Sequence, residues 1–62
     1  MEEALINYLN NRIIKHQKRI TDLKNGILVA QQPIAIAVAH CESKIQAYRE
    51  IMVTVKTLNK YN

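Results

Sequence analysis

The side chains best suited to chemistry are cations, and they gather between residues 12 and 24. Arg12, Lys15 and Arg19 follow one another at i, i+3 and i+7, a spacing that lines one side of a helix. Such a row can hold the phosphates of a nucleic acid backbone or of a nucleotide. It can equally be a solvated face that pairs with Glu42 and Glu50 of a second helix. The sequence leaves both interpretations open.

Aromatic and imidazole side chains accompany these cations. Tyr8 precedes Arg12 by one helical turn, and a tyrosine ring can stack on a nucleobase. Tyr61 would lie near Tyr8 if the two ends of the chain meet. His16 occupies an apolar position of its helix, where it can set the register or reach Tyr48. We predict a ligand- or phosphate-binding set of Tyr8, Arg12, Lys15, Arg19, His40 and Arg49.

The residue types give little support for catalysis or metal binding. Cys41 is the single cysteine, and no base is expected one helical turn from its thiol. His40 and Cys41 are adjacent, so on a helix they point about 100° apart and cannot share one ion. The five carboxylates are too scattered to form an acid–base pair. We therefore expect no enzymatic activity, no metal and no cofactor.

A heptad pattern predicts the first helix, over residues 3–25. Isoleucines recur seven apart, and the complementary positions hold mostly leucine; the two sets are Ile6, Ile13, Ile20, Ile27 and Leu9, His16, Leu23, Ala30. Asn25-Gly26 is a typical helix end, because glycine accepts the left-handed conformation after the last turn. The alternative is a helix that continues through Gly26 to about Gln31, at a cost of about 1 kcal/mol for the glycine.

Pro33 marks the start of a second helix, because proline disfavours helical geometry at the residue before it. We predict a turn over residues 26–33 and a helix over residues 34–60. A short connection between two long helices makes them antiparallel. The register then pairs Leu23 with Val38, Ile27 with Ile34, and His16 with Ile45 or Tyr48. The fold class is all-α, a single antiparallel hairpin domain over residues 1–62.

Length predicts self-association. A chain of 62 residues can bury little on its own, and one cysteine allows no internal disulfide. Residues 33–41 are apolar nearly all round, with alanines that permit close approach of another helix. We expect a homo-oligomeric helical bundle with an interface at Ile34, Ala35, Ala37, Val38 and Cys41.

Charge and hydropathy favour an anionic partner and give no sign of a membrane-spanning helix. The net charge of +4 favours an anionic partner. No apolar run approaches the 18–20 or so residues that a membrane-spanning helix needs. We expect a cytoplasmic protein, in the host cytoplasm if a phage encodes it.

Two segments resemble the helical hairpin of phage cyclic-oligonucleotide sponges, which blunt CBASS and Thoeris immunity. They are Ala4-Leu5-Ile6-Asn7 and Ile34-Ala35-Ile36-Ala37-Val38-Ala39-His40, although Gln32-Pro33 stands where that family has a bulky aromatic. The resemblance implies an oligomer that sequesters a signalling nucleotide through basic residues. Two alternatives stay open: an RNA-binding bundle of the Rop type, and a small inhibitor or adaptor that docks on a host protein.

Overall fold

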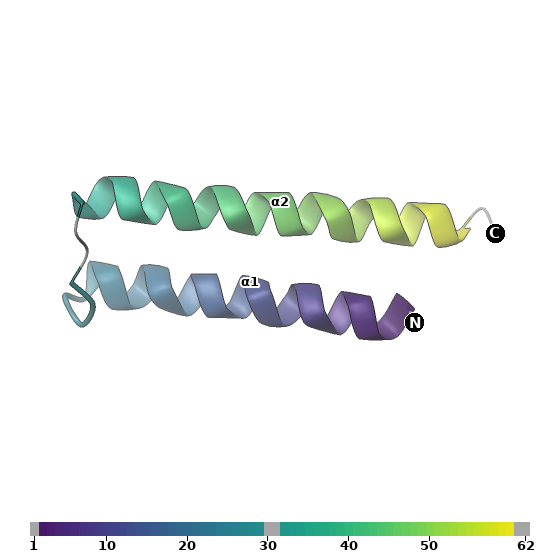
Figure 1. Cartoon of the computed structure of the whole chain (residues 1–62), viewed down its shortest axis with the longest axis horizontal. Helices are drawn as coiled ribbons and strands as arrows, with labels where there is room; N and C mark the ends of the chain where they lie inside the picture. The colour runs from purple at the N-terminus through teal and green to yellow at the C-terminus, as the bar shows by residue number, and fades with distance from the viewer. Residues whose placement is uncertain (1, 30–31, 61–62) are drawn as a thin grey trace.

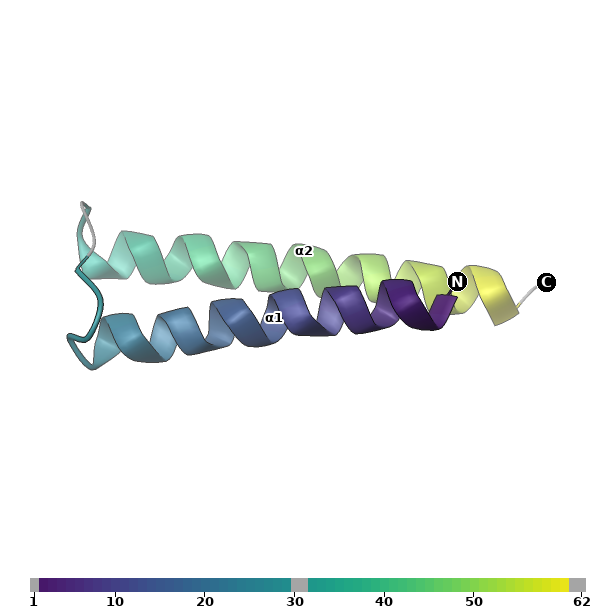
Figure 2. The same ribbon diagram turned by 60° about the horizontal axis from the view of Figure 1, so that its bottom comes forward.

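The computed structural model describes residues 2–29 and 32–60 of the chain, and these residues form two helices. α1 spans Glu2–Lys24 and α2 spans Ile34–Lys60. They run antiparallel side by side, so the start of α1 and the end of α2 lie at the same end of the hairpin, where α2 extends beyond α1 (Figures 1 and 2). This confirms the predicted all-α hairpin. Neither helix has a stretch that is long and apolar enough to cross a membrane, within the residues described.

Gly26 ends the first helix. Its φ of 75° lies in the left-handed region, which glycine occupies without a Cβ penalty. The amide of Ile27 donates to the carbonyl of Asp22 at 2.9 Å, and the amide of Gly26 donates to Leu23 at 3.3 Å. This pair of bonds is the Schellman arrangement that satisfies the last carbonyls of a helix. The alternative of a continuous helix through Gly26 is therefore wrong, and its proposed end, Gln31, lies outside the described residues.

Pro33 sits immediately before α2 and caps it. Its carbonyl accepts the amides of Ile36 and Ala37, at 3.0 and 3.1 Å. A proline has no amide hydrogen to leave unpaired at this position, so it suits a helix start. The connection from Lys24 to Ile34 is thus bounded by a glycine on one side and a proline on the other.

The core is one thin seam between the helices. Each helix contributes four buried residues: Leu9, Ile13, His16 and Leu23 from α1, and Ala37, Val38, Cys41 and Ile45 from α2. Leu23 is the most completely buried, packed with Ala37 and Val38, and Ile20 covers the group. The predicted contact of Leu23 with Val38 is therefore confirmed. The molecule that results is long and narrow, with principal extents of 45 × 17 × 14 Å.

The predicted pairing of Ile27 with Ile34 in the core is wrong. Both side chains are more exposed than buried, at 70% for Ile27 and 51% for Ile34. The reason is the Schellman turn, which directs the chain away from the helix axis after Lys24. The heptad position at Ala30 lies outside the described residues.

Candidate functional site

The candidate functional site is centred on His16, a histidine of α1. Its imidazole is buried in the seam, with 8% of its surface exposed. Neither ring nitrogen has a hydrogen-bond partner among the described residues. A buried donor or acceptor left unpaired costs about 1–3 kcal/mol. His16 is thus a polar group retained in the core at a cost in stability.

Tyr48 of α2 covers the imidazole. The two rings stack with centroids 5.9 Å apart and planes inclined by 19°. The Tyr48 hydroxyl then reaches past the ring and accepts a hydrogen bond from Nε of Arg12, at 3.4 Å. The sequence correctly paired His16 with Tyr48. The hydroxyl, however, bonds to Arg12 and leaves the histidine unpaired.

Four cations, three on α1 and one on α2, lie close enough to His16 to affect its pKa. Burial lowers the pKa of the imidazole first, and the positive charges of Lys44, Arg12, Lys15 and Arg19 lower that pKa further. Hydrogen bonding to Tyr48 raises the pKa of Arg12, so this guanidinium stays charged. We name Arg12, Lys15, Arg19 and Lys44 the cation cluster. It makes the region around His16 a site of positive potential that opposes protonation of the imidazole.

A shallow groove opens beside His16 on the side of the cluster. It has a volume of about 250 Å³. Its walls are Lys15, His16, Lys18, Arg19, Asp22 and Leu28. Three cations therefore face one carboxylate here. The volume lies below the 300–1,000 Å³ or so of pockets for drug-sized ligands, so it suits a phosphate group better than a whole dinucleotide.

Among the described residues, the cluster makes one side-chain hydrogen bond, from Arg12 to the Tyr48 hydroxyl, and none to a carboxylate. Four side-chain hydrogen bonds link the described residues, and none of them joins a basic side chain to a carboxylate. Glu50, one of the two carboxylates expected to pair with the basic face, accepts instead from Gln46 of its own helix at 3.4 Å. The positive charges of the groove thus remain available to an anion from outside.

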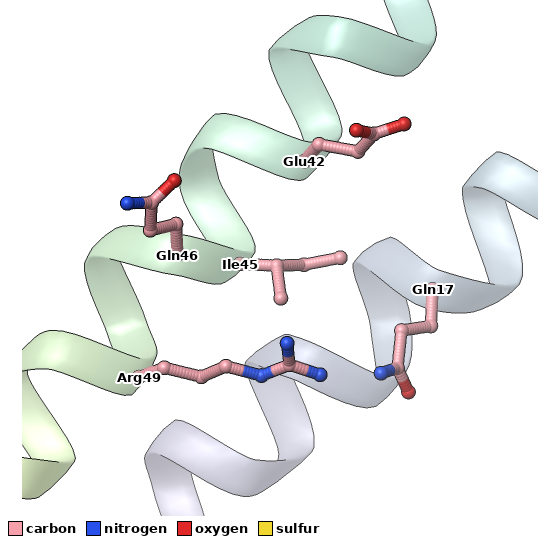
Figure 3. A pocket seen from close by; sticks show the side chains of 5 residues that line it. All are labelled: Gln17, Glu42, Ile45, Gln46 and Arg49. Carbon is pink, nitrogen blue, oxygen red and sulfur yellow. The ribbon is translucent and has the colours of Figure 1, made fainter.

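Of the predicted ligand residues, Lys15 and Arg19 line this groove, while Tyr8 and Arg12 lie further toward the start of α1. Tyr8 is 56% exposed and stands close enough to Arg12 to affect the pKa of Arg12. Arg49 lines a different groove, with Gln17, Glu42, Ile45 and Gln46, and reaches from α2 toward α1 (Figure 3). His40 is exposed on α2 and is not among the residues that line the groove of the cluster. The pocket expected from Tyr8 and Tyr61 involves a residue outside the described ones.

Lys44 was not among the ligand residues predicted from the sequence. No other basic residue adjoins it, because it stands between Ser43 and Ile45. The antiparallel register gives the signal: a residue one turn before Tyr48 must lie beside the helix-1 residues that flank His16.

The five residues predicted for the oligomer interface are not all exposed. Ala37, Val38 and Cys41 are buried within the hairpin, at 8%, 8% and 6% exposure. Ile34 and Ala35 remain exposed at the start of α2. Three of the five residues therefore serve the core of one chain. Cys41 is a buried free thiol.

No group of three or more metal-ligating side chains occurs in the part of the chain that the structure describes. Comparison with known proteins finds no matching family model, no matching curated protein and no matching solved structure.

Proposed function

We propose that the protein is a non-enzymatic binding protein whose cation cluster holds a phosphate group of a nucleotide ligand. The observation that carries this proposal is the groove beside the buried His16, which is lined by Lys15, Lys18 and Arg19 and by one carboxylate, that of Asp22. Cations repel one another, so gathering them beside a core costs free energy that a bound anion would recover.

The recognition chemistry follows from the residue types. Arginine presents a planar fork that matches phosphate oxygens in a bidentate way, and lysine adds a compact charge. The exposed ring of Tyr8, beside Arg12, supplies a surface for a base. Within this proposal the ligand is a signalling nucleotide, as the resemblance to phage sponges implies, and the biological role is sequestration during infection.

Isothermal titration calorimetry with a cyclic dinucleotide tests the proposal. Arg19→Gln removes one charge-assisted contact and should weaken binding about tenfold, which corresponds to about 1.4 kcal/mol. Arg49→Gln is the matched control, because it removes the same charge from a different groove. It should change the affinity by less than about twofold. Equal losses in both variants would mean that net charge alone attracts the ligand, and would refute the site.

The imidazole gives a second readout. A phosphate beside the cluster offsets the positive charges that lower the pKa of His16, so binding should raise that pKa. An NMR titration of the His16 ring with and without the nucleotide measures this directly. A short RNA hairpin is the competing probe. If the protein binds the RNA more tightly than the nucleotide, and the affinity for RNA falls steeply as the salt concentration rises, a Rop-type function replaces the proposal.

A further inference from the structure

The outward face of α2 carries a second row of residues, separate from the hairpin seam. Its members are three or four positions apart along the helix, and we name them the outer stripe: Ile36, His40, Ser43, Ala47, Ile51, Thr54 and Leu58. All are exposed, and none is lysine, arginine, aspartate or glutamate. Ile36, Ile51 and Leu58 expose 53%, 46% and 61% of their surfaces. A row with this spacing is what a helix presents to a further helix.

The hairpin exposes more surface than a compact monomer of its mass. The chain exposes 5003 Å². A compact monomer of 7.2 kDa exposes about 4,100 Å², so this hairpin exposes about 900 Å² more. A standard protein–protein interface removes about 800 Å² from each partner. The radius of gyration of 14.2 Å likewise exceeds the 10.6 Å or so of a compact domain of this length.

The outer stripe is complementary to itself when it is reversed. In an antiparallel pair centred on Ala47, Ile36 of one copy meets Leu58 of the other, and Ser43 meets Ile51. Ser43 thus leaves room for Ile51, the apolar Ile36 and Leu58 pair at the two ends, and Ala47 of each copy lets the two helices approach closely at the centre. A parallel pair would place Ser43 on Ser43 and Ile51 on Ile51, so that no large residue of the stripe would meet a small one. Twofold symmetry requires this kind of self-complementary patch.

We propose that the outer stripe is the interface with a second copy of this chain, in an antiparallel dimer whose twofold axis passes close to Ala47. This interface differs from the one expected at the start of α2, whose Ala37, Val38 and Cys41 pack inside the hairpin. Lys44, the one member of the cation cluster on α2, is not part of the stripe but lies beside it, three residues before Ala47.

Sedimentation equilibrium of two alanine-to-glutamate variants tests the interface. Ala47→Glu places a charge at the centre of the stripe in both copies and should raise the dimer dissociation constant about 100-fold or more. Ala35→Glu is the matched control: it is exposed on the same helix, about 120° around the axis from Ala47, and should leave the constant unchanged. Ala37→Glu cannot serve, because Ala37 is buried against Leu23. A wild-type mass of one chain at micromolar concentration, or dissociation caused by Ala35→Glu alone, would overturn the proposal.

Cysteine cross-linking keeps the test decisive if Ala47→Glu fails to fold. In a Cys41→Ala background, Ala47→Cys should form an interchain disulfide under mild oxidation, because the twofold axis brings the two copies of residue 47 together. Ala35→Cys in the same background should not. Equal cross-linking of both variants, or none at position 47, would contradict the assigned axis.

Discussion

His16 of α1 stacks on Tyr48 of α2, with ring centroids 5.9 Å apart and planes inclined by 19°. The Tyr48 hydroxyl accepts a hydrogen bond from Arg12, but neither ring nitrogen of His16 has a hydrogen-bond partner among the described residues. The hairpin therefore retains an unpaired polar group in its seam, beside four positive charges. This relationship links stability, pH dependence and the candidate ligand site.

His16→Leu should stabilise the hairpin. The substitution replaces two unpaired nitrogens with an apolar side chain of similar size, and the gain should be about 1–3 kcal/mol. Urea denaturation followed by circular dichroism measures the free energy of unfolding. Asn10→Leu is the control, since Asn10 is exposed on α1 and its replacement should change stability by less than about 0.5 kcal/mol. A less stable His16→Leu variant would show that the imidazole makes a favourable contact in the folded protein.

Stability should fall on acidification because of His16. The folded pKa of His16 is lowered from the usual 6.5, so the unfolded chain binds a proton at higher pH than the folded chain does. The stability is therefore fully present above about pH 6.5 and decreases as the pH falls through the range between the two pKa values. Below the folded pKa, both states are protonated and the loss levels off.

Unfolding curves at a series of pH values check this dependence. His16→Gln should remove the decrease below about pH 6.5, because glutamine does not titrate. His40→Gln keeps the buried imidazole of His16 and should retain the decrease. If the two variants show the same pH profile as the wild type, the decrease belongs to the carboxylates and the expectation for His16 is wrong.

Tyr48→Phe should cost much less than Tyr48→Ala. Phenylalanine keeps the ring that covers His16 and loses only the long, partly buried hydrogen bond from Arg12. Alanine removes the ring as well, uncovers His16, and should cost about 2 kcal/mol. Thermal denaturation of the two variants compares them. Similar losses in both would assign the stabilisation to the hydroxyl and not to the stacked ring.

Gly26→Ala should destabilise the hairpin through the backbone alone. A Cβ at this position would meet no atom within 4 Å, so there is no steric clash with neighbours. The φ of 75° is nevertheless left-handed, and a residue with a Cβ pays about 1–2 kcal/mol to adopt it. Gly26→Asn should cost less than Gly26→Ala, because asparagine tolerates this conformation. If Gly26→Ala and the wild type had the same denaturant midpoint, the turn would have relaxed to a backbone conformation that alanine adopts without strain.

Leu23→Ala should be the most damaging of the aliphatic truncations. Leu23 is 1% exposed and contacts Ala37 and Val38 at the turn end of the seam. The loss should be about 2–4 kcal/mol, enough to unfold much of so small a domain. Val29→Ala is the matched control, because Val29 is 95% exposed and should tolerate the change. Helical content at room temperature distinguishes the two variants.

Local sequence signals by themselves determined where the helices lie. The heptad of isoleucine and leucine, the glycine after Asn25 and the proline before Ile34 each act within a few residues, so the chain alone indicates two helices and an antiparallel return. The pairing of His16 with Tyr48 followed from the same register. These inferences need no knowledge of side-chain packing.

The tertiary structure alone decided which face of each helix is buried and which charges meet. An apolar residue such as Ala37 fits either a core or an interface, and the sequence could not distinguish the two until the rotation of α2 about its axis was known. The same rotation brings Lys44 to the side of His16 and carries Arg49 to another groove. Rotation and crossing geometry depend on how all the seam residues pack at once, which no short stretch of sequence records.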